Sequence, residues 1–426
     1  MAFHTLGCKL NFSETSSISR MLEEDGFEKK DFDGLADVYV INTCSVTENA
    51  DKECRYLVRG IQRKAPESLV VITGCYAQLK PKEIAAIPGV DLVLGAAEKF
   101  NIGVHLKELA KGDSAKISSC EIEEVSGFNA SFSLSDRTRS FLKVQDGCDY
   151  NCSFCTIPMA RGKSRSDTVE NVIRNAEQLA LTGVKEIVLT GVNLGDFGKG
   201  DLTQTLSKRE GFKKHEENFF DLVQALDKVD GIERYRISSI EPNLLTNEII
   251  EFVANSDKFM PHFHIPLQSG SNKTLAAMRR RYKRELYTER VQLIKTLMPH
   301  CAIGVDVIVG FPGETEQDFK ETFDYLHSLD VSYLHVFTYS ERANTLAAEL
   351  KPVVPVHVRN ERNKQLRNLS YQKMQYFTNQ HVGQIRKVLF ESQDQNGMME
   401  GFTDNYIKIT TPFKPAWQNS IVPWKI

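Results

Sequence analysis

The stretch Gly147-Cys148-Asp149-Tyr150-Asn151-Cys152-Ser153-Phe154-Cys155 carries three cysteines at C-x3-C-x2-C spacing. Thiolates at this spacing can bind three irons of a 4Fe-4S cube from one short loop, because cysteine thiolate is the ligand that such clusters use. A cube with three protein ligands keeps one iron open, and a small molecule can complete the coordination there. A structural zinc site is the alternative, but zinc usually takes four ligands in C-x2-C pairs, and no fourth cysteine lies nearby in the sequence. The spacing therefore favours an iron–sulfur cluster.

A second group of cysteines is dispersed along the first part of the chain. Cys8, Cys44 and Cys75 each follow an apolar, strand-like run, and helical patterns over about 13–24 and 46–64 separate them. Strands that alternate with helices predict βαβ units and a parallel sheet. Ligands bind at the carboxyl edge of such open sheets, so we expect the three thiols to converge there. They predict a second 4Fe-4S cluster with a free iron, the alternative being three unrelated buried cysteines.

Composition and charge limit the classes to which the protein can belong. The chain has 426 residues, of which 41% are hydrophobic and 26% charged, as expected of a soluble globular protein with two or three domains. No apolar stretch approaches the roughly 18 residues that span a membrane, and no secretory signal is visible, so no membrane segment is expected. Cysteines that serve as metal ligands indicate a reducing compartment, the cytoplasm. The net charge of −3 does not by itself predict a nucleic-acid partner.

The pattern divides the chain into three α/β or β units. Residues 1–112 are expected to form an open parallel α/β sheet, and residues 113–135, rich in Ser, Glu and Asn, a linker. Residues 136–375 repeat a βα pattern, which predicts an open or partial (β/α)6 barrel with catalytic groups at the carboxyl ends of its strands. The strands are expected over 141–145, 186–190, 234–238, 262–266, 303–309 and 333–337. Residues 376–426 alternate in the manner of a small antiparallel β-barrel.

Basic and aromatic residues suggest where RNA would be bound. The run around residues 279–284 and the C-terminal unit are candidate phosphate and base contacts, since basic groups interleaved with aromatic rings suit unpaired nucleotides. A solvated helix face and a β appendage that only completes the fold are the alternatives. A basic insertion at about 199–215 is expected to be a surface loop, with an RNA contact as a further expectation. The candidate residues are Arg279, Arg280, Arg281, Lys283, Arg386, Lys387 and Tyr406.

The C-x3-C-x2-C loop resembles the signature of radical S-adenosylmethionine (SAM) enzymes. In that superfamily the open iron binds the amino and carboxylate groups of SAM, and the reduced cluster cleaves it into methionine and a 5′-deoxyadenosyl radical. The resemblance makes Cys148, Cys152 and Cys155 the catalytic cluster ligands. It also implies cofactor contacts at the strand ends, with turn chemistry as the alternative for each. These candidates are Asn193 for the amino group, Ser239 and Glu241 for the ribose, Gln268 for the cofactor or a base, and Gly310 for the adenine.

The whole pattern is similar to the methylthiotransferases, which insert sulfur into an unactivated C–H bond and methylate it. Their members combine the two cysteine groups with a C-terminal β-barrel of the TRAM type. Thr5-Leu-Gly-Cys-Lys-Leu-Asn11 and Met278-Arg-Arg-Arg-Tyr282 resemble the enzyme for N6-threonylcarbamoyladenosine in tRNA. The isopentenyladenosine enzyme would carry Gly-Cys-Gln-Met-Asn near Cys8, and the ribosomal-protein enzyme Gly-Cys-Pro-Lys-Asn. Arg342-Ala-Asn-Thr345 departs from the Arg-Pro-Gly-Thr of the family, which puts a special turn there in doubt.

This resemblance implies a reaction and its partners. The enzyme would convert N6-threonylcarbamoyladenosine to its 2-methylthio derivative in the tRNA anticodon loop, with two 4Fe-4S clusters and SAM as cofactors. The base would leave its stack to enter a site between the clusters. The partners implied are the tRNA anticodon stem-loop and a reductant such as flavodoxin or ferredoxin, for a monomeric chain; the sulfur source is not indicated. The alternatives are the isopentenyladenosine or ribosomal-protein enzyme, an iron–sulfur electron carrier, and a non-catalytic iron–sulfur RNA-binding protein.

Overall fold

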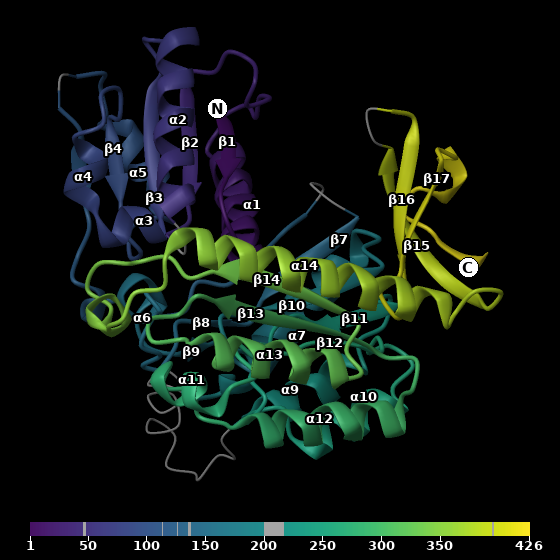
Figure 1. Cartoon of the computed structure of the whole chain (residues 1–426). Helices are drawn as coiled ribbons and strands as arrows, with labels where there is room; N and C mark the ends of the chain where they lie inside the picture. Colours follow the sequence, from purple (N-terminus) through teal and green to yellow (C-terminus); the bar gives the residue numbers. More distant parts are fainter. Residues whose placement is uncertain (46–47, 113, 126, 135–137, 200–216, 394–395) are drawn as a thin grey trace, which may run out of the picture.

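Five parallel strands form the N-terminal sheet of the computed structural model, which describes residues 1–45, 48–112, 114–125, 127–134, 138–199, 217–393 and 396–426 (Figure 1). The insertion expected at 199–215 lies, from residue 200 on, outside these ranges. The strands pair in chain order: β1 (Ala2–Thr5), β2 (Val38–Thr43), β3 (Leu69–Gly74), β4 (Leu92–Leu94) and β5 (Lys116–Ser118). The predicted open parallel sheet is therefore present at the N-terminus.

Helices cover both faces of this sheet because alternate strand residues point to opposite sides. Val70 and Ile72 of β3 join the core beneath α2, whereas Val71 joins the core beneath α1 and α5. The helices are α1 (Lys9–Glu24), α2 (Glu48–Lys64), α3 (Cys75–Leu79), α4 (Pro81–Ala85) and α5 (Ile102–Lys107). Burial on both faces explains why the strands read as continuous apolar runs.

Six parallel strands run through the central unit. They pair as β7–β10–β11 and as β12–β13–β14, and a bridge from Tyr235 in β11 to Phe259 links the two groups. Their bounds are β7 (Arg139–Lys143), β10 (Glu186–Thr190), β11 (Arg234–Ile237), β12 (His262–His264), β13 (Ala302–Val309) and β14 (Tyr333–Thr338). Short strands β8 (Gln145–Asp146) and β9 (Arg165–Ser166) pair beside the cysteine loop.

Helices alternate with the strands of the central unit. Polar side chains cap several of them: Thr168 accepts a hydrogen bond from the backbone N–H of Asn171, and Thr315 and Asp318 form a capping box. The helices are α6 (Ile157–Arg161), α7 (Val169–Leu181), α9 (Phe219–Leu226), α10 (Asn247–Asn255), α11 (Asn272–Ala277), α12 (Arg284–Leu297), α13 (Glu316–Ser328) and α14 (Val356–Asn379), with 3-10 turns η2 (Leu194–Asp196) and η3 (Leu346–Glu349). None of the helices in the described ranges has the length and apolarity needed to cross a bilayer.

The segment expected to be a linker carries regular structure. Its β5 completes the N-terminal sheet by pairing with β4, η1 (Ile122–Glu124) follows, and β6 (Ser131–Phe132) pairs antiparallel with β7. The sequence did not predict these strands because each is short and polar. Each has only two or three residues and lies at the edge of a sheet.

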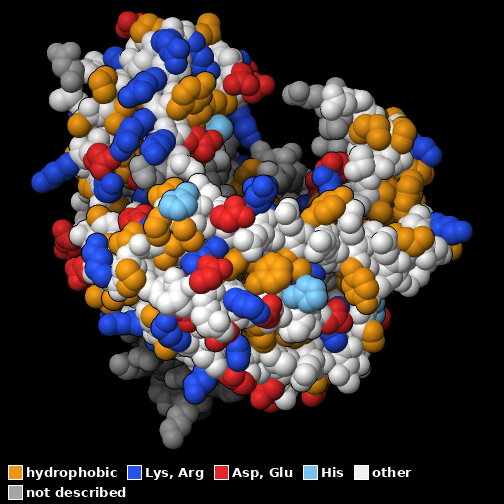
Figure 2. Space-filling model, viewed as in Figure 1, with side chains coloured by type: hydrophobic (Ala, Val, Ile, Leu, Met, Phe, Trp, Pro, Cys, Tyr) orange, Lys and Arg blue, Asp and Glu red, His pale blue; other side chains and the backbone are white. Residues whose placement is uncertain are grey.

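Four antiparallel strands form the C-terminal sheet, in the order β17–β16–β15–β18. Phe390, Trp417 and Trp424 pack against one another in its core. The elements are β15 (Ile385–Gln393), β16 (Met398–Thr403), β17 (Lys408–Pro412), η4 (Pro415–Trp417) and β18 (Ile421–Lys425). This sheet and the N-terminal unit stand on the same side of the central unit (Figure 1). The space-filling surface is hollowed between them, and Lys and Arg side chains lie along its margins (Figure 2).

Candidate functional site

The cysteine loop of the central unit follows β7 and β8, at the carboxyl end of the first parallel strand. Each thiol receives one hydrogen bond: Cys148 from the backbone N–H of Tyr150 at 3.4 Å, Cys155 from that of Ile157 at 3.4 Å, and Cys152 from the Arg280 guanidinium at 3.1 Å. Burial, together with the neighbouring thiols, raises the pKa of Cys148 and of Cys155 to about 12. Thiols so hard to ionise need a metal to become thiolates, and N–H···S contacts are typical of cluster loops. The donor set therefore fits a three-cysteine cluster.

The dispersed cysteines lie together at the carboxyl edge of the N-terminal sheet. Cys8 precedes α1, Cys44 follows β2, and Cys75 opens α3 after β3. Gly7 has a φ of +103°, and a Cβ there would lie 3.0 Å from the Cys44 sulfur. Burial raises the pKa of the Cys75 thiol, while Arg161 acts to lower it and Cys8 to raise it. These three thiols also fit a cluster, since glycine lets the Cys8 loop approach Cys44 closely.

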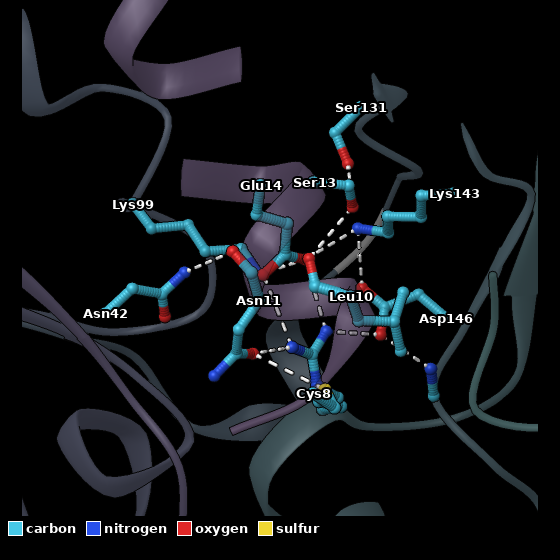
Figure 3. A network of polar contacts seen from close by, with 12 residues as sticks. Cys8, Leu10, Asn11, Ser13, Glu14, Asn42, Lys99, Ser131, Lys143 and Asp146 are labelled. Atoms are coloured by element: carbon cyan, nitrogen blue, oxygen red, sulfur yellow. Dashed lines mark hydrogen bonds and ion pairs between the residues drawn. The ribbon is translucent and has the colours of Figure 1, made fainter. Parts of the chain in front are cut away.

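A buried ionic network around Glu14 lies beside Cys8 (Figure 3). Glu14 of α1 is fully buried and pairs with Lys99 at 2.6 Å, Lys143 at 2.9 Å and Arg161 at 3.1 Å. Arg161, six residues beyond Cys155, also pairs with Asp146 at 2.8 Å. Burial alone would raise the pKa of Glu14, but the three cations hold it well below its usual range. The network holds the N-terminal unit on the central unit through ion pairs between Glu14 and the cations Lys143 and Arg161.

An apolar cavity of about 230 Å³ opens beside Cys155. Its walls come from the cysteine loop and from the ends of β13 and β14. The residues that line it are Phe154, Cys155, Thr156, Ile157, Gln268, Asp306, Ile308, Phe337, Thr338, Tyr339 and Ser340. Apolar walls with a few polar groups are typical of a nucleoside pocket.

Asn193 presents a buried, unsatisfied acceptor near the same loop. Its side-chain amide donates to Asp196 at 2.7 Å, and Asp196 lies close enough to Cys148 to raise the pKa of that thiol. The Oδ1 atom of Asn193 has no hydrogen-bond partner among the described residues. An orphaned buried acceptor is costly, so a donor such as a ligand amine would be well accommodated there.

A second cavity, of about 310 Å³, lies where the three units meet. Cys8 and Lys9 enter it from the N-terminal unit, Arg236 and His262 from the central unit, and Tyr406 from the C-terminal sheet. The Tyr406 ring stacks on His262 with a centroid distance of 4.0 Å. The lining is completed by Thr5, Gly7, Phe12, Arg139, Phe141, Val188, Ile237 and Ser238. This cavity, which we call the junction cavity, is thus lined by one of the N-terminal cysteines and several cations.

Cations dominate the electrostatics of the junction cavity. Lys9 is solvent-accessible, yet desolvation by the surrounding protein, together with Arg139 and Arg236, lowers its pKa to about 8. Burial, Arg236 and Lys9 hold the pKa of His262 well below its usual range, so that this ring is neutral at pH 7. The cavity is therefore suited to an anionic ligand.

His264, Asp306 and His335 form a polar group between the cavities. Their ligand atoms lie within 4.8 Å of one another, which would allow a metal ion. The side chains are already paired, however, because Asp306 lies 2.8 Å from His264 and 3.3 Å from His335. Burial would raise the pKa of Asp306, but the two imidazoles hold it well below its usual range.

Comparison with known proteins identifies the family. Residues 142–326 match the Radical SAM superfamily, and residues 1–95 match the Uncharacterized protein family UPF0004. The threonylcarbamoyladenosine tRNA methylthiotransferase MtaB of Bacillus subtilis (strain 168) is 42% identical over 96% of this chain and 89% of that protein. The MtaB of Aquifex aeolicus (strain VF5) is 39% identical over 96% of both. This chain belongs to the radical SAM tRNA methylthiotransferases.

A solved structure shares the fold of this methylthiotransferase. The radical S-adenosylmethionine methyltransferase TsrM from Kitasatospora setae, with tryptophan substrate and a SAM analogue bound, has a TM-score of 0.55. The match covers 97% of this chain and 85% of TsrM at 13% sequence identity, so it supports the fold alone.

One predicted RNA contact of the methylthiotransferase is corrected. Arg280 has a side chain only 4% exposed, forms an ion pair with Glu241 and donates to Cys152. It therefore cannot reach an RNA phosphate without leaving a buried carboxylate unpaired. Arg279, Arg281 and Lys283 are exposed as expected, and the Arg281 guanidinium lies 3.9 Å from the centre of the Tyr150 ring.

The C-terminal candidates lie in three different environments. Lys387 is exposed, whereas Arg386 is held by Asp404 through two hydrogen bonds of 2.8 Å. Tyr406 lines the junction cavity instead of the outer surface. The C-terminal sheet thus contributes to the cavity directly.

The predicted cofactor residues are also distributed unevenly. Gln268 lines the apolar cavity, Ser239 is half-buried just beyond β11, and Glu241 is occupied by Arg280. Gly310 does not line that cavity: its φ is +75°, and a Cβ there would lie 2.3 Å from Arg359, so its missing side chain accommodates an arginine. That the backbone of Gly310 lies against the adenine of the cofactor stays a prediction.

Sequence reasoning missed the cations of the junction cavity. Of these, Arg236 lies on β11 two residues from Arg234, a spacing that places both on one face of the strand, although Arg234 is not among the lining residues. That spacing was a usable signal, but it required knowing which face points inward.

Proposed function

We propose that this methylthiotransferase acts on N6-threonylcarbamoyladenosine beside the tRNA anticodon and forms its 2-methylthio derivative. The observation that carries the proposal is the pair of three-cysteine groups joined through Glu14 and Arg161, each with three thiols and no fourth cysteine ligand among the described residues. The relatives named for this modification, which match almost the whole chain, support the choice of nucleoside.

The residues fit the implied cofactors. Cys148, Cys152 and Cys155 would hold one 4Fe-4S cluster and Cys8, Cys44 and Cys75 the other. When bound, the clusters and SAM supply the one-electron and methyl-transfer chemistry that an unactivated aromatic C–H bond requires.

The residues of the chain would bind and orient SAM and exclude water from it. The apolar cavity beside Cys155 would hold the adenosyl part of SAM, and the Asn193 amide oxygen would accept a hydrogen bond from its amino group. Radical chemistry on a C–H bond needs no general base, which is consistent with the absence of a poised catalytic acid–base pair among the described lining residues of either cavity.

Further parts of the proposal concern architecture and partners. The six parallel strands would form a partial (β/α)6 barrel, with unit boundaries near residues 112, 135 and 375, and the C-terminal sheet a TRAM-like RNA-binding barrel. Arg279, Arg281, Lys283 and Lys387 would contact the phosphates of the anticodon stem-loop. The enzyme would act as a cytoplasmic monomer with a reductant such as flavodoxin or ferredoxin.

Nucleoside mass spectrometry of tRNA from cells with and without the gene tests the proposal. Loss of 2-methylthio-N6-threonylcarbamoyladenosine is the expected result. Loss of the isopentenyl analogue instead would replace the proposed substrate, and no change in either would reject a role in tRNA modification.

Iron content tests the cluster assignment. Anaerobically prepared protein should contain roughly eight irons, four per cube, and Cys8→Ala or Cys152→Ala should each lose about half. Cys120→Ala is the matched control, since this cysteine lies outside both groups, and should keep all of them. Roughly four irons in the unaltered chain would contradict the two-cluster assignment.

A further inference from the structure

Lys9 is a cation without a partner in the junction cavity. Its ammonium makes no hydrogen bond and no ion pair with any residue in the described ranges. It follows Cys8 directly, so its position is tied to the N-terminal cysteine group and to the first turn of α1. Lys9 is exposed and lines the cavity, so its ammonium is open to an anionic ligand that enters there.

The other cations of the cavity are already engaged. Arg236 donates to Glu186 at 2.8 Å and to the carbonyl oxygens of Thr403 and Asp404 at 2.7 and 2.9 Å. Arg139 pairs with Glu391 at 2.8 Å and lies 3.9 Å from Glu186. These arginines hold the C-terminal sheet in place and leave Lys9 as the free cation among the described lining residues.

No carboxylate in the described part of the chain is available to Lys9. Asp306 acts on it electrostatically, but this carboxylate is held by His264 and His335. Glu186 is shared among Arg139, Arg234 and Arg236. The positive excess of the cavity therefore calls for an anion from outside the chain.

We propose that Lys9 is a specificity-determining residue, whose ammonium binds the carboxylate of the N6-threonylcarbamoyl group when the base enters the junction cavity. This inference rests on the proposed function. The threonyl carboxylate is the one anionic group that the modified base itself carries, whereas an isopentenyl group is apolar and would leave Lys9 unpaired. A phosphate of the RNA backbone is the competing anion, and the experiment separates the two.

Two anticodon stem-loops test the proposal on the cluster-loaded full chain under anaerobic conditions. One carries N6-threonylcarbamoyladenosine, and the other the same nucleoside with its carboxylate converted to the carboxamide. The unaltered enzyme should bind the carboxylate RNA about 10- to 100-fold more tightly than the carboxamide RNA, the range expected for one charged hydrogen bond. The same ratio should appear in KM, with little change in kcat, because the contact is already made in the bound substrate.

Variants assign this preference to Lys9. Lys9→Met should reduce the carboxylate-to-carboxamide ratio to about one, and Lys9→Arg should restore part of it. Lys320→Met, which removes an exposed lysine of α13 paired with Asp324, is the matched control and should keep the full ratio. Iron content and the visible spectrum of each variant report whether the clusters are retained beside the altered residue.

Each outcome decides the proposal. No preference in the unaltered enzyme, or a preference that survives Lys9→Met, overturns it, and this comparison of two RNAs needs no variant to fold. Equal weakening of both RNAs by Lys9→Met assigns Lys9 to a backbone phosphate and also overturns it. Failure of the unaltered enzyme to methylthiolate the carboxylate RNA, with turnover of an isopentenyladenosine RNA, rejects the proposed function itself.

Discussion

The guanidinium of Arg161 donates a hydrogen bond of 2.5 Å to the Oδ1 atom of Asn11. Asn11 in turn donates to the carbonyl oxygens of Leu6 at 2.9 Å and Thr43 at 3.0 Å, which lie just before Cys8 and Cys44. One arginine at the end of α6, just after the cysteine loop of the central unit, therefore braces two of the three cysteine-bearing turns of the N-terminal unit.

Replacing Arg161 tests this brace. Arg161→Met would leave the carboxylates of Glu14 and Asp146 buried with fewer cations, and we expect the free energy of unfolding to fall by about 3–5 kcal/mol. Anaerobic urea denaturation measures the change. Arg174→Met is the control, since its pair with Glu170 is exposed and is worth about 0–1 kcal/mol. A loss of less than about 1 kcal/mol for Arg161→Met would contradict the assignment.

Arg280 should tune the cluster held by the C-x3-C-x2-C loop. Arg280→Met removes the charged donor from the Cys152 sulfur, and we expect the reduction potential of this cluster to become more negative, because hydrogen bonds to sulfur stabilise the reduced form. A redox titration followed by electron paramagnetic resonance measures the shift. Arg281→Met, which removes the neighbouring guanidinium over Tyr150, should leave the potential nearly unchanged. A positive shift for Arg280→Met would show that its role is not donation to sulfur.

Tyr406 should contribute both to the packing of the C-terminal sheet against the central unit and to RNA binding. Tyr406→Ala removes its stacking on His262 and Phe402, and we expect unfolding to become easier by about 1–3 kcal/mol, together with weaker binding of the anticodon stem-loop. Thermal unfolding and fluorescence anisotropy measure the two effects. Tyr371→Ala, at an exposed position on α14, should change neither by a measurable amount. Unchanged RNA binding in Tyr406→Ala would place the RNA path outside the junction cavity.

The apolar cavity beside Cys155 should bind SAM and not tRNA. Ile308→Phe would fill part of it, and we expect the Kd for SAM to rise at least about tenfold while the Kd for the stem-loop stays the same. Equilibrium dialysis with the cluster-loaded enzyme measures the first value and anisotropy the second. Ile117→Phe, at an exposed position outside the cavity, makes the same change in volume and is the matched control. If SAM bound Ile308→Phe normally while RNA binding failed, the apolar cavity would be assigned to RNA and the junction cavity to SAM.

Much of the fold was predictable because its signals are local. Apolar runs such as Val38–Thr43 end at a cysteine or a glycine turn, and the structure has strands in these places. The shortest pieces, β5 and β6, escaped prediction because two or three polar residues carry no usable periodicity, and β18 because Pro423 interrupts it.

The site was only partly predictable. The cysteine spacing predicted both groups, Gln268 lines a cavity and Asn193 has a buried acceptor without a partner among the described residues, but Arg280 was predicted to contact RNA because it lies in a run of basic residues. Its partner Cys152 lies 128 residues away, so no pattern around Arg280 reports the contact.

By itself, the sequence determined the two groups of cysteines, the alternation of strands and helices, and the family, because spacing and periodicity are properties of neighbours along the chain. The tertiary structure alone decided which charges face one another. Glu14 meets Arg161 across 147 residues, and Lys9 shares a cavity with Arg236 and Tyr406 from the other two units. Such pairings depend on how the three units pack together. The interaction energy between two charges becomes large only when that packing excludes the water around them.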